Sequence, residues 1–110
     1  MPDVTRDDQY NRLFAALDQA VPLLRRYSKD SWADWLESDR VKIAEGGSYG
    51  LGHLLQAFGR IGSLNDLIID PVNGDVVEDL DVSAANEELT DLREEIWTTA
   101  EAIRRAINAE

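Results

Sequence analysis

Four stretches of the chain carry apolar residues at the three- and four-residue spacing that marks one face of a helix. The first stretch extends from about Thr5 to Tyr27, the second from Ser31 to Ala44, and the third from Ser48 to near Gly59. The fourth and clearest begins at Ser83 or Asn86 and ends near Asn108; its apolar positions are Leu89, Leu92, Ile96, Ala100, Ile103 and Ile107. This pattern predicts a mainly α protein, a compact bundle of about four helices in one domain that spans residues 1–110.

Proline and glycine residues inside the predicted helices are expected to bend or weaken them. Pro22 lies inside the first stretch, where it removes one backbone donor, so we expect a kink or a break near residues 19–21. Gly50 and Gly52 lie inside the third stretch. Each weakens a helix by about 1 kcal/mol relative to alanine, and such glycines usually allow another backbone to come close.

The segment between the third and fourth stretches has the signals of a turn. Asn73-Gly74 favours a type I′ turn and is flanked by short apolar runs. This predicts a short β-hairpin that pairs Asp66–Ile69 with Asp75–Glu78. An irregular loop is the alternative, because an isolated two-stranded hairpin is marginally stable.

The charge of the chain is concentrated in one third of its length. The net charge is −11, and residues 63–95 carry eleven acidic residues and a single base, Arg93. Phosphate repulsion argues against direct binding to nucleic acid, and a basic protein surface is the natural complement. The alternative is that the acidity only keeps the protein soluble. If the charge is used for binding, the expected contact residues are Asp79, Asp81, Glu87, Glu88, Asp91, Glu94 and Glu95.

Composition excludes several classes of protein. The chain has no cysteine, so disulfides and thiolate catalysis are excluded, and this suits a reducing cytosol. No apolar run approaches the roughly 20 residues of a membrane span. The polar residues 1–11 do not resemble a signal peptide. We therefore expect a cytoplasmic protein with no membrane association.

No group of residues specifies a reaction. Residues 46–50 fit the Gly-x-Ser-x-Gly pattern of a nucleophile elbow, but a predicted helix precedes them where the elbow needs a strand. The acidic residues around Gly74 do not have the spacing of a calcium-binding loop. His53, the single histidine, can be a general base or a metal ligand, but its place beside Leu54-Leu55 favours a packed, hydrogen-bonded role. We expect no enzyme, no metal site and no cofactor.

The middle of the chain resembles a family of short bacterial proteins of unknown function. The resemblance rests on Ser31-Trp32-x-x-Trp35-Leu36-Glu37 and on Ala57-Phe58-Gly59 followed by Gly62-Ser63-Leu64-Asn65-Asp66-Leu67. It covers about Ser31 to Ile69. The family motif has Gly-Met where this chain has Arg60-Ile61. The resemblance implies a compact helical fold and no catalytic residues, and small bacterial proteins of this kind suggest immunity or accessory roles by analogy.

Polar and glycine residues follow the third predicted helix. Gly59 and Gly62 flank a tight exit from it, and the side chains of Ser63, Asn65 and Asp66 can bond back to the backbone, as such side chains do in turns. We interpret these five residues as a structural turn. The alternative is a ligand site that also includes His53.

Three functional hypotheses follow. The first is an acidic protein-binding module, of the kind that immunity proteins and inhibitors of basic, nuclease-like partners represent. The second is a homodimer or accessory protein that pairs through Leu89, Leu92, Ile96 and Ile103 of the last helix. The third is a small-ligand binder around His53, Asn65 and Asp66. Trp97 lies beside the apolar face of the last helix, and we expect it to be half buried.

Overall fold

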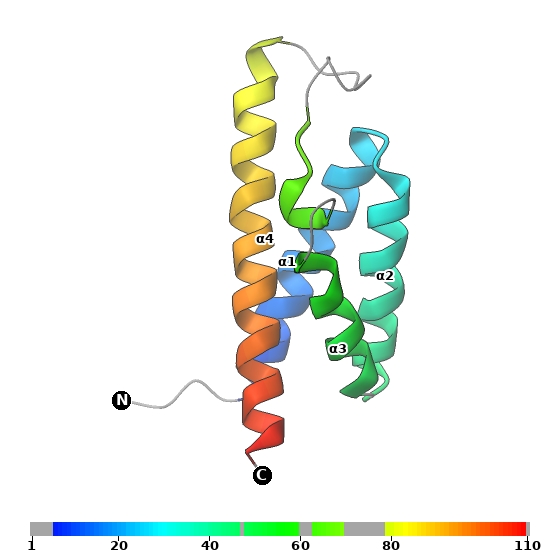
Figure 1. Ribbon diagram of the computed structural model, residues 1–110, viewed down its shortest axis with the longest axis vertical. Coiled ribbons are helices and arrows are strands. Elements are labelled where there is room, and N and C mark those ends of the chain that lie inside the picture. Colours follow the sequence, from blue (N-terminus) through cyan, green and yellow to red (C-terminus); the bar gives the residue numbers. More distant parts are fainter. Residues whose placement is uncertain (1–5, 47, 60–62, 70–78, 110) are drawn as a thin grey trace, which may run out of the picture.

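The structure, a computed structural model, describes residues 6–46, 48–59, 63–69 and 79–109. Its elements in chain order are α1 (Arg6–Arg26), α2 (Asp30–Ala44), α3 (Ser48–Leu55), η1 (Gln56–Phe58), η2 (Leu64–Asp66) and α4 (Asp79–Asn108), where η denotes a 3₁₀ helix (Figure 1). The mainly α, four-helix class predicted from the sequence is confirmed, and the described residues contain no strand.

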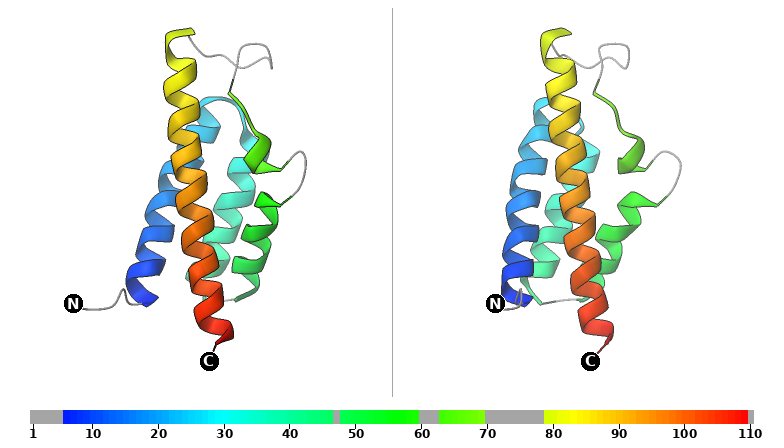
Figure 2. Two further views of the ribbon diagram at one scale, coloured as in Figure 1. Left: turned by 60° about the vertical axis from the view of Figure 1, so that its left-hand side comes forward. Right: turned by 90° about the vertical axis from the view of Figure 1, so that its left-hand side faces the viewer.

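The helices alternate in direction along the bundle. Chain direction reverses from α1 to α2, again from α2 to α3, and again before α4 (Figures 1 and 2). α1 packs against both α2 and α4, and α3 also packs against both. α3 is short, and η1, η2 and the extended residues 67–69 continue its path along α4 (Figure 1).

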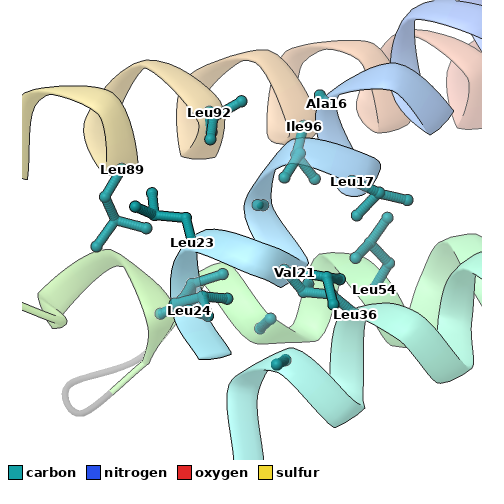
Figure 3. Packing of buried hydrophobic residues seen from close by; sticks show 14 of the residues in the cluster. Ala16, Leu17, Val21, Leu23, Leu24, Leu36, Leu54, Leu89, Leu92 and Ile96 are labelled. Atoms are coloured by element: carbon teal, nitrogen blue, oxygen red, sulfur yellow. The ribbon is translucent and has the colours of Figure 1, made fainter. Parts of the chain in front are cut away.

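All four helices contribute their apolar faces to one core. Leu17 and Leu24 of α1, Leu36 of α2, Leu54 of α3 and Ile96 of α4 are each at most 1% exposed (Figure 3). Burying a leucine or isoleucine side chain contributes about 1.5–3 kcal/mol, so this contact is the main source of stability.

The apolar face of α4 is part of that core. The residues proposed for homodimer pairing are Leu89, Leu92, Ile96 and Ile103, and none is more than 8% exposed. A second copy could reach this face only if the bundle opened.

Pro22 does not divide the first helix, contrary to one of the outcomes expected from the sequence. α1 continues from Arg6 to Arg26 with Pro22 inside it. The neighbouring Val21, Leu23 and Leu24 are all buried. Their burial offsets the roughly 3 kcal/mol that an interior proline costs.

The link between α1 and α2 is a Schellman motif. The backbone N–H of Lys29 donates to the Leu24 carbonyl at 2.7 Å, and that of Ser28 donates to Arg25 at 3.1 Å. Ser28 occupies the left-handed position of this motif, with φ of 63°, which glycine usually fills. These bonds satisfy carbonyls at the end of α1 and set the reversal into α2.

The beginning of the last helix was predicted too late. α4 begins at Asp79, before both Ser83 and Asn86. Asn86 is not a cap, because its amide group bonds to Ile69.

The first predicted hairpin strand, Asp66–Ile69, is not a strand: Asp66 ends η2, and residues 67–69 are extended without a strand partner among the described residues. The second, Asp75–Glu78, lies outside the described residues.

Substitution of alanine for each of the two glycines of α3 should have opposite effects on stability. A Cβ atom at Gly50 would lie 2.9 Å from Cγ1 of Ile43 and 3.2 Å from its backbone nitrogen, whereas at Gly52 it would meet nothing within 4 Å. Gly50→Ala should therefore destabilise the protein by about 1–3 kcal/mol, because α2 and α3 must separate. Gly52→Ala should stabilise it by up to about 1 kcal/mol through helix propensity. Urea unfolding of both variants measures this, and equal effects at the two positions would contradict the close contact.

Candidate functional site

Acidic residues gather on the exposed side of α4. Asp81, Glu87, Glu88, Asp91 and Glu94 are all exposed, and we call these five residues the acidic face. The helical repeat places Glu87, Asp91 and Glu94 opposite the buried positions Leu89, Leu92 and Ile96, and Glu88 lies beside them. Asp81 is 11 positions before Leu92 and is therefore aligned with the buried side, but it is exposed in the first turn of the helix. The same periodicity that buries one face of α4 thus gathers four of the five carboxylates on the other.

The acidic face has no ion-pair partner among the described residues, unlike many other acids. Arg40 binds Asp18 through two hydrogen bonds, at 2.6 and 3.1 Å. Arg25 lies 2.9 Å from Asp34 and 3.5 Å from Glu37. The pairing of acids with bases between α1 and α2 leaves most of the uncompensated charge on α4.

Two of the seven predicted contact residues stand apart from this face. Glu95 is bound by Arg12 of α1, with Nη2 and Nε at 2.7 and 2.9 Å from Oε1, so its carboxylate already has a partner within the chain. Asp79 is the first residue of α4, and its side chain lies outside the described part of the structure.

Arg93 holds the 63–69 segment against α4. Its Nη1 donates to the carbonyls of Leu64, Asn65 and Leu67 at 2.9, 3.0 and 3.0 Å. Its Nη2 donates to the hydroxyl of Thr90 at 3.0 Å. The one base in the acidic third of the chain therefore binds three backbone carbonyls, of which only that of Leu64 also accepts a backbone hydrogen bond, from Leu67 at 3.2 Å.

Within the turn itself, two of the predicted residues make local bonds. The Ser63 hydroxyl accepts from the backbone N–H of Asn65 at 3.3 Å, and the Asn65 amide donates to the Phe58 carbonyl at 2.9 Å. Gly59 has φ of −121°, which any residue adopts, and open space where a side chain would lie. The turn therefore does not require glycine at position 59. Gly62 and the side chain of Asp66 lie outside the described structure.

Asn86 makes a second connection between α4 and the same segment. Its Oδ1 accepts from the backbone N–H of Ile69 at 2.8 Å, and its Nδ2 donates to the Ile69 carbonyl at 2.7 Å. Both backbone groups of a residue that is 0% exposed are thereby satisfied. One side-chain amide supplies the pairing that a neighbouring strand would supply in a sheet.

His53 is hydrogen-bonded to a buried carboxylate. Its Nδ1 lies 2.7 and 2.8 Å from the two oxygens of Asp39, which is fully buried. The imidazole stacks on Trp35 at 4.5 Å between ring centroids, and Trp35 Nε1 donates to the His53 carbonyl at 3.3 Å. A carboxylate only accepts, so this geometry places a proton on Nδ1 and directs Nε2 outward.

This Asp–His pair resembles the base and orienting acid of a nucleophilic site, in which a third group would supply the nucleophile. Nε2 makes no hydrogen bond to any described residue. The contacts of His53 are to α2 and to Tyr49, whereas those of Asn65 are to η1 and α4. The structure therefore does not join His53 and Asn65 in one ligand site, as the third hypothesis required.

The structure contains a hollow between α4 and the 63–69 segment that was not predicted from the sequence. It has a volume of about 440 Å³ and is lined by Phe58, Asn65, Thr90, Arg93, Glu94 and Trp97. Trp97 is 44% exposed, as half-burial predicted, and Phe58 is buried beneath. The helical spacing of Thr90, Glu94 and Trp97 could have indicated one face, but the lining from Phe58 and Asn65 depends on a tertiary contact.

No described helix combines the length and apolarity needed to cross a bilayer. No three of the described histidine, aspartate and glutamate residues are grouped so that they could hold a metal ion.

Replacement of Arg93 should destabilise the protein more than replacement of an ordinary surface arginine would. Arg93→Met should lower the free energy of unfolding by about 2–4 kcal/mol, because three carbonyls lose a charged donor. Arg104→Met is the matched control, since Arg104 is exposed on the same helix and pairs with no described residue. Urea unfolding compares the two. Equal small losses would show that Arg93 does not hold the 63–69 segment.

Asp39 should make the free energy of unfolding depend on pH in a defined direction. Burial raises the pKa of the Asp39 carboxyl above its ordinary value, and the hydrogen bond from His53 opposes the rise only in part. The folded state therefore keeps this proton to higher pH than the unfolded state. The stability that protonated Asp39 contributes is present below about pH 3.8 and is lost as the pH rises through the folded-state pKa.

The measurement is urea unfolding of the wild type and of Asp39→Asn between about pH 3 and pH 5.5, a window that begins below the ordinary pKa of an aspartate carboxyl and extends above it. The wild type should lose stability relative to the variant as the pH rises. A relative gain would show that pairing with His53 outweighs burial.

Comparisons with known proteins give one match. Residues 25–78 match a family model described as a domain of unknown function (DUF6966). This range begins at the end of α1 and includes α2, α3 and the 63–69 segment, but it stops before α4. No curated protein and no solved structure matches the chain. The match includes residues 31–69, on which the resemblance in the sequence rests, and is consistent with an uncharacterised family.

Proposed function

We propose that this chain is a protein-binding module that acts through the acidic face of α4 on a basic protein partner, by binding and not by catalysis. One observation carries the proposal: the five carboxylates of the acidic face are exposed on one helix, four of them on its outer side, and none has an ion-pair partner among the described residues. Most acids on α1 and α2, such as Asp18 and Asp34, are instead paired with arginines.

The dimensions of the face suit an extended basic surface. Glu87 and Glu94 are 7 positions apart in one helix, which separates them by about 10 Å along its axis. The four carboxylates over that length give roughly one charge per 3 Å. A single strand of duplex DNA carries one phosphate per about 3.4 Å. The acidic face therefore has a charge density near that of one nucleic-acid strand, on a rigid support.

This likeness favours an inhibitor or immunity protein of a nuclease-like partner over other binding roles. A basic cleft that attracts phosphates would also attract the acidic face, and the field would accelerate association. The partner would then be blocked without any reaction in this chain. Free nucleic acid is not the proposed ligand, because the same charges repel it.

Self-association through α4 receives less support. The apolar residues that could pair with a second copy are in the core, and the exposed side of the helix carries like charges that would repel a copy of itself.

The proposal predicts salt-sensitive capture of a basic protein. The test is an affinity pull-down from a lysate of the encoding organism at about 50 mM and about 500 mM NaCl, where charge screening differs strongly. Captured proteins are identified by mass spectrometry, purified and bound again one at a time. A basic protein should be captured at low salt and lost at high salt, and its own activity should fall when this chain is added.

Two charge variants make the test specific. In the first, Asp81→Asn, Glu87→Gln, Glu88→Gln and Asp91→Asn neutralise most of the acidic face while Glu94 is kept. In the second, Asp7→Asn, Asp30→Asn, Asp34→Asn and Glu45→Gln make the same change in net charge on exposed positions of α1, α2 and the turn after α2. The first variant should lose the partner and the second should keep it. Equal loss would mean that net charge, and not this face, is responsible.

A further inference from the structure

The hollow beside the acidic face exposes an aromatic ring. Trp97 forms part of its wall with 44% of its surface exposed, and Phe58, which is 6% exposed, also lines it. Tryptophan is enriched among the residues that dominate binding energy at protein interfaces, where it pairs with a complementary group of the partner. The position of Trp97 at an open hollow therefore indicates a contact point.

The electrostatics of the hollow favour a cation. Glu94 lies in its wall, exposed and without a described ion-pair partner, and Asp91 and Glu87 follow on the same side of α4. Arg93 also lines the hollow, but its guanidinium donates to three backbone carbonyls and to Thr90. These acceptors are neutral, so they occupy N–H groups of Arg93 but leave its charge of +1 in place. The attraction for a cation comes from the carboxylates of Glu94, Asp91 and Glu87, which outnumber that single positive charge.

The acceptors of the hollow extend beyond Glu94. Asn65 uses its amide nitrogen to donate to the Phe58 carbonyl at 2.9 Å. Its amide oxygen makes no hydrogen bond to a described residue, so it can accept from a ligand. The hollow thus combines an aromatic ring, a carboxylate and an amide oxygen on elements that Arg93 holds together.

We propose that this hollow receives an arginine side chain of the basic partner. A guanidinium group stacks flat on an indole ring while its edge donates to a carboxylate, and a volume of about 440 Å³ is sufficient for it. A lysine ammonium lacks both the flat face and the forked donors, so it matches the site less well. The inference rests on the proposed function, because it assigns one anchoring contact within the basic surface that the acidic face attracts.

The hollow is tested without the partner, using short peptides as probes. Acetyl-Gly-Arg-Gly-amide is titrated into ¹⁵N-labelled protein, with the same peptide carrying citrulline or lysine as controls. The indole N–H resonance of Trp97, identified by its absence in Trp97→Phe, should shift with the arginine peptide. Citrulline has the shape of arginine without its charge and should produce no shift. The lysine peptide should bind at least about threefold more weakly.

Substitutions separate the contributions. Glu94→Gln should weaken the arginine peptide about three- to tenfold, whereas Glu45→Gln, at an exposed position after α2, should not. Trp97→Leu should abolish binding, measured through the backbone amides of Thr90 and Glu94, and Trp97→Phe should retain part of it because a ring face remains. Melting curves establish that each variant is folded. Equal shifts with arginine and citrulline, or equal affinity for lysine, would overturn the inference.

The two proposals fail in different ways. If neutralisation of the acidic face releases a captured partner while Trp97→Leu and Glu94→Gln bind that partner as tightly as the wild type does, the function stands and the arginine site is refuted. If no basic partner is captured but the arginine peptide binds with the stated selectivity, the site stands and the partner proposal fails.

Discussion

The hydrogen bonding between α4 and the 63–69 segment is the contact on which the rest of the structure depends. After Phe58 the chain forms only the single 3₁₀ turn η2, in which the Leu67 N–H donates to the Leu64 carbonyl at 3.2 Å, and the carbonyls of Asn65 and Leu67 accept no backbone hydrogen bond from a described residue. Arg93 donates to these three carbonyls from α4, and Asn86 accepts from the backbone N–H of Ile69 and donates to its carbonyl. Without Asn86 both backbone groups of the buried Ile69 would lose their partners, at about 1–3 kcal/mol for each group, and without Arg93 the three carbonyls would lose a charged donor.

This contact and the core together fix the position of α4, the helix that carries the acidic face. The inner face of α4 packs on the core through Leu89, Leu92 and Ile96 (Figure 3), which fixes the rotation of the helix. Once that rotation is fixed, the helical repeat places the acidic face outward and Trp97 at the edge, next to Phe58. The position of the proposed binding surface is therefore a consequence of the core and of Arg93, and the carboxylates themselves contribute little to it.

The sequence predicted what depends on local pattern and did not predict what depends on tertiary contact. Helical periodicity identified the four helices and the half-buried Trp97, because both follow from spacing along a single element. It allowed a break in α1 near Pro22, which does not occur because core packing offsets the cost of the proline, and it placed the start of α4 at Ser83 or Asn86, later than Asp79. The pairing of His53 with Asp39, 14 residues apart, has no local signature. Neither does the hollow, which needs three separate elements.

The residues that hold the fold together and the residues that carry the uncompensated charge occupy different parts of the chain. The uncompensated carboxylates on α4 lie outside residues 25–78, the range that matches the family model, whereas the turn that Arg93 binds lies within it. Substitutions at exposed positions of a helix usually change stability by less than about 0.5 kcal/mol. The acidic face can therefore vary without disturbing the core, but Arg93, Asn86 and the apolar face of α4 cannot. The core and the 63–69 segment hold α4 in place, and no packing contact among the described residues restricts which residues occupy its exposed side. This arrangement is suited to binding by charge.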